Sequence, residues 1–223
     1  MKPTLGILGG TGHEGRGLAR RWLRAGYPVV IGSRDAARAR AAAAGLAEEA
    51  PAAAAAVSGT DNIDAARRAD IIVLTVPFAA HRATLESVRE AVQGKILVDV
   101  TVPLVPPKVA RVQLPPEDSA AVAAQALLGP DVRVVSAFQN ISSHLLERAD
   151  TPVDCDVLVC GDDKDARETV VRLARDAGMR GLHAGALANS TAAEALTSVL
   201  IALNMRYKIK HAGVRFTGLP EGA

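Results

Sequence analysis

The sequence predicts an α/β fold: a Rossmann-type, mainly parallel sheet with helices on both faces and a small, largely helical C-terminal extension. Short aliphatic runs alternate with longer segments of helical periodicity along most of the chain. Aromatic residues make up only 3% of the sequence, so the core must be built from Val, Leu, Ile and Ala, as in parallel strands covered on both faces. A glycine-rich turn follows the first aliphatic run.

The composition is that of an ordinary soluble globular protein. Of the 223 residues, 49% are hydrophobic and 22% charged, and the net charge of +2 produces no strong field for nucleic acid. No run of eighteen or more uncharged apolar residues predicts a membrane span. Two cysteines form no disulfide framework, and the five histidines share no metal-ligand spacing. We therefore expect a cytoplasmic protein without a metal site, nucleic-acid partner or membrane anchor.

The expected elements follow in order along the chain. The aliphatic runs that predict strands are Thr4–Gly9, Pro28–Gly32, Asp70–Pro77, Gly94–Pro103, Val132–Phe138 and Cys155–Gly161. The helical patterns between them cover residues 14–25, 34–49, 79–92, 117–128 and 164–177. Right-handed crossovers would place these helices on both faces of the sheet.

The end of the chain departs from this alternation. The prolines within 103–116 predict a loop over the carboxyl edge of the sheet. Thr191 and Glu194 are spaced as a capping box, which predicts the start of a long terminal helix with one apolar face. We divide the chain into a Rossmann-type domain, residues 1–137, and a smaller C-terminal part, residues 138–223. The apolar helix face predicts a homodimer.

The strongest motif is the glycine loop after the first run. Gly10, Gly12 and Gly15 form G-x-G-x-x-G between a predicted strand and a predicted helix, which is the context that dinucleotide binding requires. Gly10 would allow the tight turn, Gly12 the approach of the pyrophosphate, and Gly15 close helix packing. The loop residues Thr11, His13 and Glu14 would lie beside the phosphates. A glycine-rich turn without a ligand is the alternative.

The end of the second run selects the nucleotide. Ser33 and Arg34 stand where an NAD site has an acidic residue, and Arg38 follows one helical turn later. With Thr11 they supply four donors for a 2′-phosphate, which favours NADP. A solvated helix face is the alternative interpretation of Arg34 and Arg38.

Five segments carry a family resemblance over nearly the whole chain. They are Leu8–Gly12, Ile31–Arg34, Leu74–Pro77, Val157–Asp163 and His183–Leu187. With the short C-terminus, they resemble the NADPH-dependent reductases of the deazaflavin coenzyme F-420, also described as NADP oxidoreductase, coenzyme F-420-dependent. The resemblance implies reversible hydride exchange between NADPH and coenzyme F-420 as co-substrate, with Thr11, Ser33, Arg34 and Arg38 on the 2′-phosphate.

The resemblance also implies a second pocket beside the nicotinamide. By the resemblance its walls include Phe78, Pro103, Gln139, Ile141 and residues near Met205 and Tyr207. Val76, Pro77 and Val102 are expected beside them because small aliphatic residues suit a dry cleft for hydride transfer. In this division residues 1–137 bind NADP, and 138–223 complete the second cofactor pocket. Gln139 stands where another family member has His, and a glutamine supplies no proton near neutral pH. Gln139 and Asn140 are expected to hold a ring carbonyl, but no side chain is expected to be catalytically essential, since hydride transfer needs mainly orientation.

Several alternatives stay open on the sequence alone. The chain could be an NADP-dependent dehydrogenase or imine reductase of a small metabolite, or an NADPH-sensing protein without turnover. His81 could help start its helix or contact the cofactor, and Asp99 could face the cleft. The basic residues Arg206, Lys208 and Lys210 could steer an anionic substrate or only solubilise the surface.

Overall fold

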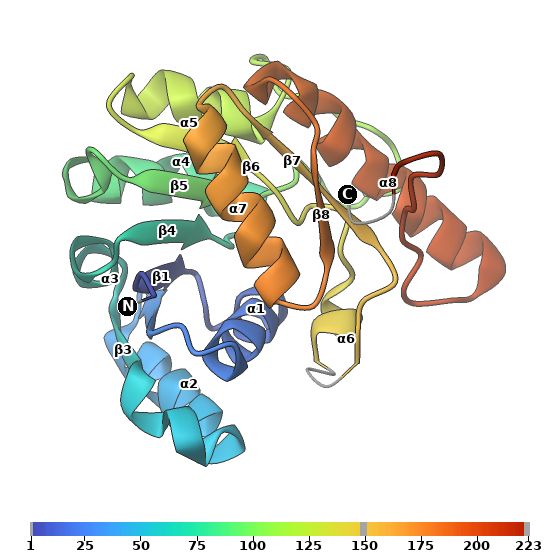
Figure 1. Cartoon of the computed structure of the whole chain (residues 1–223). Helices are drawn as coiled ribbons and strands as arrows, with labels where there is room; N and C mark the ends of the chain where they lie inside the picture. Colours follow the sequence, from blue (N-terminus) through green and yellow to red (C-terminus); the bar gives the residue numbers. More distant parts are fainter. Residues whose placement is uncertain (1, 148–150, 221–223) are drawn as a thin grey trace.

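A single eight-stranded sheet forms the centre of the molecule (Figure 1). The computed structural model describes residues 2–147 and 151–220. The strand order is β3-β2-β1-β4-β5-β6-β7-β8. The strands are β1 (Leu5–Leu8), β2 (Val29–Ser33), β3 (Val57–Asp61), β4 (Ile71–Leu74), β5 (Ile96–Asp99), β6 (Arg133–Ser136), β7 (Asp156–Gly161) and β8 (Arg180–His183).

Helices cover both faces of this sheet. They are α1 (His13–Arg24), α2 (Ala36–Glu49), α3 (Asn62–Arg68), α4 (Phe78–Val88), α5 (Ala120–Leu128), α6 (Ser143–Leu146), α7 (Lys164–Asp176) and α8 (Ser190–Tyr207). Short 3-10 turns occupy Pro51–Ala56, Arg89–Val92 and Leu187–Asn189. One aliphatic core packs α1, α2 and α7 on the sheet, and a second packs α3, α4 and α5 on the other face. The predicted fold class is therefore confirmed.

The strands that matter for the site end level with one another. Leu8 pairs with Gly32 on one side and with Leu74 on the other, and the register continues from Leu74 to Asp99 and Ser136. All these pairings are parallel, so five carboxyl ends share one edge. β6 and β7 pair antiparallel, and strands on both sides of residue 137 thus belong to the same sheet.

Four helices and strands of the described structure escaped the sequence analysis: β3, β8, α3 and the four-residue α6. β3 has the sequence Val-Ser-Gly-Thr-Asp and β8 has Arg-Gly-Leu-His, so neither shows an aliphatic run. Both are edge strands, where one side is unpaired and propensity is a weak signal. At Gly59 a Cβ would lie 2.2 Å from the carbonyl oxygen of Ala39, so β3 requires glycine there to pack under α2. The seven-residue α3 was missed because its pattern is short.

The predicted capping box at the start of the last helix is wrong. Asn189 is the N-cap of α8 and makes no side-chain cap, although the helix does span 190–207 as one long element. Glu194 instead reaches a different helix: its carboxylate accepts from the backbone N–H groups of Ala120 at 2.7 Å and Ala121 at 3.1 Å. Ser119 caps the same end of α5, which begins at Ala120 rather than at 117.

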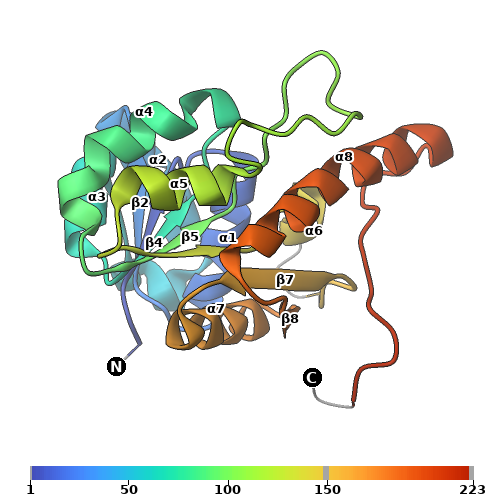
Figure 2. The same cartoon turned by 90° about the horizontal axis from the view of Figure 1, so that it is seen from above.

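The last helix extends well beyond the sheet. Figure 2 shows α8 running away from the body of the molecule, with the segment 103–116 projecting on the same side. The predicted loop at 103–116 contains no helix or strand. No helix of the described ranges, 2–147 and 151–220, is both long and apolar enough to cross a lipid bilayer.

Candidate nucleotide-binding crevice and adjoining cavity

The glycine loop connects β1 to α1 at the level edge of the sheet. The amide of Gly10 donates to the carbonyl oxygens of Ile7 and Gly32, which ties the loop to the end of β2. The left-handed residue of the turn is Gly9, with φ of 75°, rather than Gly10. Gly10 is required for space, because its Cβ would lie 2.8 Å from the Ile7 carbonyl oxygen.

The other two glycines of the motif differ in what surrounds them. A Cβ at Gly15 would lie 2.7 Å from the Cα of Gly10, so the start of α1 packs directly on the loop. A Cβ at Gly12 would meet nothing nearer than the Gly9 carbonyl oxygen, at 3.7 Å. Gly12 is the N-cap of α1 and has no side-chain cap, so the first amides of the helix face open space. This leaves a site where a phosphate can approach the helix N-terminus.

The four expected 2′-phosphate donors lie in the loops after β1 and β2. Ser33 is buried, and its hydroxyl oxygen accepts from the Asp35 amide, which leaves the hydroxyl proton available. The side chains of Arg34 and Arg38 are exposed and form no hydrogen bond or ion pair with another described residue. Asp35 caps α2 by accepting from the amides of Ala37 and Arg38, so it is committed to the helix and not to a ribose.

The strand order reverses between β1 and β4, which makes the carboxyl ends of these two strands the candidate nucleotide crevice. This topological switch point is where open α/β sheets bind nucleotides. Thr75, Val76 and Pro77 follow β4 there, and Thr75 donates its hydroxyl to the Leu8 carbonyl oxygen at 3.0 Å. Phe78 begins α4 and is half-buried.

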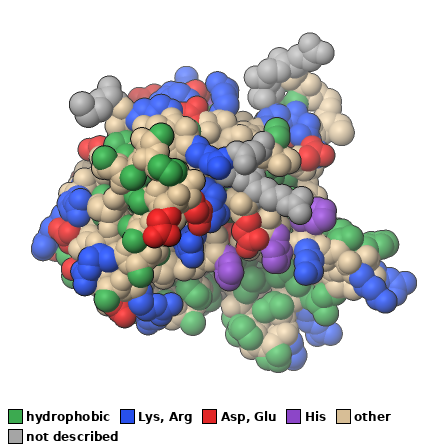
Figure 3. All heavy atoms as spheres, turned by 90° about the horizontal axis from the view of Figure 1, so that it is seen from below, with side chains coloured by type: hydrophobic (Ala, Val, Ile, Leu, Met, Phe, Trp, Pro, Cys, Tyr) green, Lys and Arg blue, Asp and Glu red, His purple; other side chains and the backbone are tan. Residues whose placement is uncertain are grey.

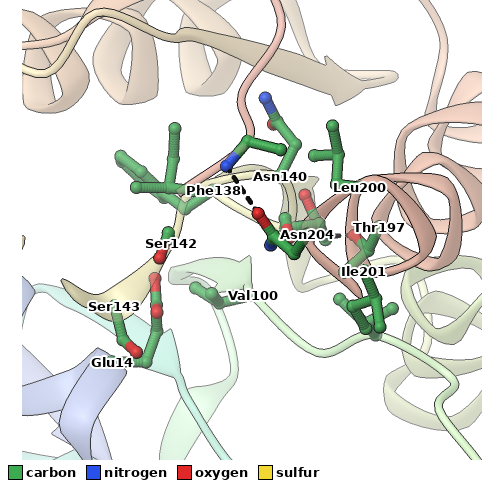
Figure 4. A pocket seen from close by; sticks show the side chains of 14 residues that line it. Glu14, Val100, Phe138, Asn140, Ser142, Ser143, Thr197, Leu200, Ile201 and Asn204 are labelled. Atoms are coloured by element: carbon green, nitrogen blue, oxygen red, sulfur yellow. Dashed lines mark hydrogen bonds between the residues drawn. The ribbon is translucent and has the colours of Figure 1, made fainter. Parts of the chain in front are cut away.

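A cavity of about 290 Å³ adjoins the crevice (Figure 4). It is lined by Val102 after β5 and by Gln139, Asn140 and Ile141 after β6, which were expected at the second pocket. Glu14 of α1, which was expected beside the phosphates, lines it as well. Helix α8 supplies a wall that the sequence analysis missed. Its lining residues lie one or two turns apart, a spacing that could have indicated a shared face: Thr197, Leu200, Ile201 and Asn204.

Some predicted wall residues lie elsewhere in this chain. Met205 and Tyr207 are 69% and 68% exposed at the end of α8 and do not line the cavity. Val76, Pro77, Phe78 and Pro103 are also absent from its lining. His13 is exposed at the rim and lies 3.6 Å from the carboxylate of Glu147.

A strained residue shapes the cavity floor. Phe138 has φ of 74°, a conformation that costs a non-glycine residue about 1–3 kcal/mol. Its ring is fully buried and stacks edge-on against Trp22, with centroids 5.7 Å apart. Thr197 of α8 donates to the Gln139 carbonyl oxygen at 2.9 Å. The reversal at Phe138 therefore places the next two side chains at the cavity.

The side chains of His81 and Asp99 contact each other, which the sequence analysis of neither residue anticipated. Both are buried, and His81 Nε2 lies 2.7 Å from Asp99 Oδ2. Asp99 Oδ1 accepts from the Thr101 amide at 3.0 Å. The pair links the first turn of α4 to the end of β5, so Asp99 is held by protein groups and does not line the cavity. Among the residues with assigned structure, no three acidic, histidine or cysteine side chains are grouped to hold a metal ion.

The buried carboxyl group of Glu194 is expected to make the free energy of unfolding depend on pH. Burial raises its pKa from 4.5 to about 8, against the opposing effect of the two amides that it accepts from. The unfolded chain therefore loses this proton first, and stability falls by roughly 1.4 kcal/mol per pH unit as the pH rises from about 4.5 to about 8. Denaturant titrations across this pH range should show that the free energy of unfolding declines clearly less steeply with pH in Glu194→Gln than in the wild-type protein. An unchanged slope in that variant would contradict this assignment.

Comparison with known proteins gives one consistent family. The family described as NADP oxidoreductase, coenzyme F-420-dependent, matches residues 4–103. The chain is 42% identical to an F-420-dependent NADP reductase of Methanothermobacter thermautotrophicus, over 99% of this chain and 97% of the relative. It is 40% identical to the protein of the same name from Methanocaldococcus jannaschii, over 96% of this chain and 98% of that one.

Solved structures agree with the sequence relatives. A crystal structure of a candidate F-420-dependent NADP-reductase from an Arthrobacter species superimposes with a TM-score of 0.82 at 26% identity, covering 96% of this chain and 99% of that one. An imine reductase from Myxococcus stipitatus, at 23% identity and a TM-score of 0.58, shares the fold.

Proposed function

Because the chain belongs to the family of coenzyme F-420-dependent NADP oxidoreductases, we propose that its crevice and cavity hold NADPH and the deazaflavin ring in contact. The protein is an oxidoreductase that transfers a hydride reversibly between NADPH and coenzyme F-420. The observation that carries the assignment to this site is the placement of the open N-terminus of α1 beside the cavity, with Glu14 lining it.

The residues divide between the two substrates. The amides after Gly12 receive the pyrophosphate, and Thr11, Ser33, Arg34 and Arg38 receive the 2′-phosphate. Val76, Pro77 and Phe78 border the nicotinamide, and Val102, Gln139 and Ile141 border the deazaflavin, with Pro103 directly after Val102 in the chain and outside the lining. Residues 1–137 thus hold NADP, and 138–223 complete the second pocket. The apolar character of these walls supports this division, since a dry cleft would keep the two reacting carbons within about 3–3.5 Å.

Mixing the protein with NADPH and oxidised coenzyme F-420 tests this function directly. We expect the visible absorbance of the deazaflavin to disappear as NADPH is consumed. Binding of NADPH without any loss of that absorbance would indicate an NADPH sensor. Turnover of a ketone or imine with an inert deazaflavin would indicate a metabolite reductase.

The protein is further proposed to act in the cytoplasm on small molecules rather than nucleic acid. Two buried free thiols, Cys155 and Cys160, and a net charge of +2 support this proposal. Arg206, Lys208 and Lys210 stay exposed on or after the end of α8, where they are available to attract the anionic tail of the coenzyme.

A homodimer is proposed from the apolar surface at the projecting side. Figure 3 shows hydrophobic side chains gathered on the side from which α8 extends. The exposed apolar residues there are Val105, Val112, Leu114, Val199, Leu203, Met205 and Tyr207. A second copy of the chain would cover this surface and bring Met205 and Tyr207 into contact with protein.

Leu203→Glu tests the dimer. A charge at a buried contact costs several kcal/mol, so we expect light scattering after gel filtration to shift from dimer to monomer mass at micromolar concentration. Ile63→Glu is the matched control, because Ile63 is equally exposed on α3. A wild-type protein of monomer mass would contradict the proposal.

A further inference from the structure

The cavity presents hydrogen-bond acceptors that have no protein donor. Gln139 Oε1, Asn140 Oδ1 and Glu14 Oε1 are shielded from solvent and unpaired among the described residues. All three side chains line the same cavity, and they come from α1 and from the loop after β6. Figure 4 shows Glu14 and Asn140 among the lining residues. Buried polar atoms without partners are rare in folded proteins, and at a cavity they indicate where a ligand completes the bonding.

The two amides cannot offer N–H groups to a ligand. Gln139 Nε2 donates to the Asp99 carbonyl oxygen at 2.7 Å and to Ser136 Oγ at 2.9 Å. Asn140 Nδ2 donates to the Asp156 carbonyl oxygen at 2.7 Å and to Cys155 Sγ at 3.3 Å. Because each amide nitrogen faces a backbone carbonyl, the orientation of both amides is determined.

This arrangement corrects one expectation from the sequence. Gln139 and Asn140 were expected to hold a ring carbonyl, which requires a donor. With all four of their N–H groups committed to the protein, they present only oxygens and select for an N–H group on the ligand.

Glu14 differs from every other side chain at the cavity. Among the 14 residues that line the cavity, it is the only one with an acidic or basic side chain. Burial alone raises its pKa from 4.5 to about 8, so near neutral pH it is a carboxylic acid with an O–H to donate. The charged groups around it are paired elsewhere: His13 with Glu147 at the rim, and Arg16 with Glu49.

We propose that Glu14 is the acid of the reaction and gives its proton to the deazaflavin ring when the hydride arrives. The inference rests on the proposed function. It also accounts for Gln139, which occupies a position where another family member has His and cannot supply a proton itself. Gln139 Oε1 and Asn140 Oδ1 accept the N–H of the ring and orient the edge that Glu14 protonates.

The step balances in atoms and charge. The C–H bond of the dihydronicotinamide breaks, and its electron pair forms a new C–H bond on the deazaflavin, which leaves NADP oxidised. The negative charge that reaches the ring nitrogen is neutralised by the proton from Glu14. The carboxylate that results is reprotonated by solvent through the open mouth of the cavity. In the reverse direction Glu14 accepts the ring proton as the hydride leaves.

Glu14→Gln tests the proposal, because it keeps the shape of the side chain and removes the titrating proton. Rapid-mixing measurements of deazaflavin reduction by NADPH should show a loss of about 10²- to 10⁴-fold in the transfer rate. The wild-type rate should decline as the pH rises through about 8, and the variant should lack this transition. Glu147→Gln at the rim is the matched control and should keep the wild-type rate and pH profile.

A readout independent of turnover completes the experiment. Infrared difference spectra of the wild-type protein between pH about 6 and about 10 should contain a protonated-carboxyl band that Glu14→Gln diminishes. Glu194→Gln identifies the contribution to this band of Glu194, the other carboxyl group whose pKa is raised. A Glu14→Gln protein with the wild-type rate and pH profile overturns the proposal, as does a band that the variant leaves intact. A wild-type protein that never reduces the deazaflavin instead overturns the proposed function.

Discussion

Replacing Arg34 with alanine is expected to weaken NADP binding about 10- to 100-fold while NAD binding stays nearly unchanged. Arg34 is exposed at the end of β2 and has no protein partner among the described residues, so its guanidinium is available to the 2′-phosphate. A charge-assisted hydrogen bond of this kind contributes roughly 1.5–3 kcal/mol. NAD lacks the phosphate and therefore loses nothing.

Titrations of both nucleotides against wild type and Arg34→Ala measure this effect. Arg40→Ala is the matched control: Arg40 is also exposed on α2, but it lies two residues beyond Arg38 and faces a different direction. Equal losses for NADP and NAD in Arg34→Ala would mean that the arginine supports the loop rather than the phosphate.

Replacing Trp22 with alanine is expected to destabilise the fold by about 3–5 kcal/mol. The indole is fully buried, donates its Nε1–H to the Leu173 carbonyl oxygen at 2.9 Å, and stacks on Phe138. It thus joins α1, α7 and the strained residue before the cavity amides. Denaturant unfolding measures the loss of stability. It is followed by circular dichroism, because Trp22 is the single tryptophan of the chain and the variant has no tryptophan fluorescence to follow.

The same substitution should also affect the two substrates differently. Without the indole, Phe138 loses the contact that supports its unusual backbone conformation, so the apparent affinity for coenzyme F-420 should fall more than that for NADPH. Trp22→Phe is the control, because it keeps a ring against Phe138 and loses mainly the hydrogen bond, about 1 kcal/mol. A Trp22→Ala protein as stable as Trp22→Phe would contradict this account.

The structural features that depend on a few neighbouring residues were predicted correctly. The strand–helix alternation, the glycine loop between β1 and α1, and the mainly parallel sheet all follow from local periodicity and spacing. Asp163 caps α7 through a similarly local contact, since its side chain accepts from the Ala166 amide three residues later. The edge strands β3 and β8 were missed because their stability comes from packing on neighbours rather than from their own residues.

The sequence by itself therefore determined the fold class and the glycine loop between β1 and α1, and it predicts a nucleotide crevice with donors for a 2′-phosphate, because each depends on residues that are close along the chain. Only the tertiary structure decided which polar groups of the second pocket are free. Gln139 and Asn140 are turned by carbonyls of Asp99 and Asp156, and Glu194 is drawn to a helix 73 residues away instead of capping its own. Burial that raises the pKa of Glu14 likewise comes from distant segments. Local sequence patterns do not reveal such distant partners.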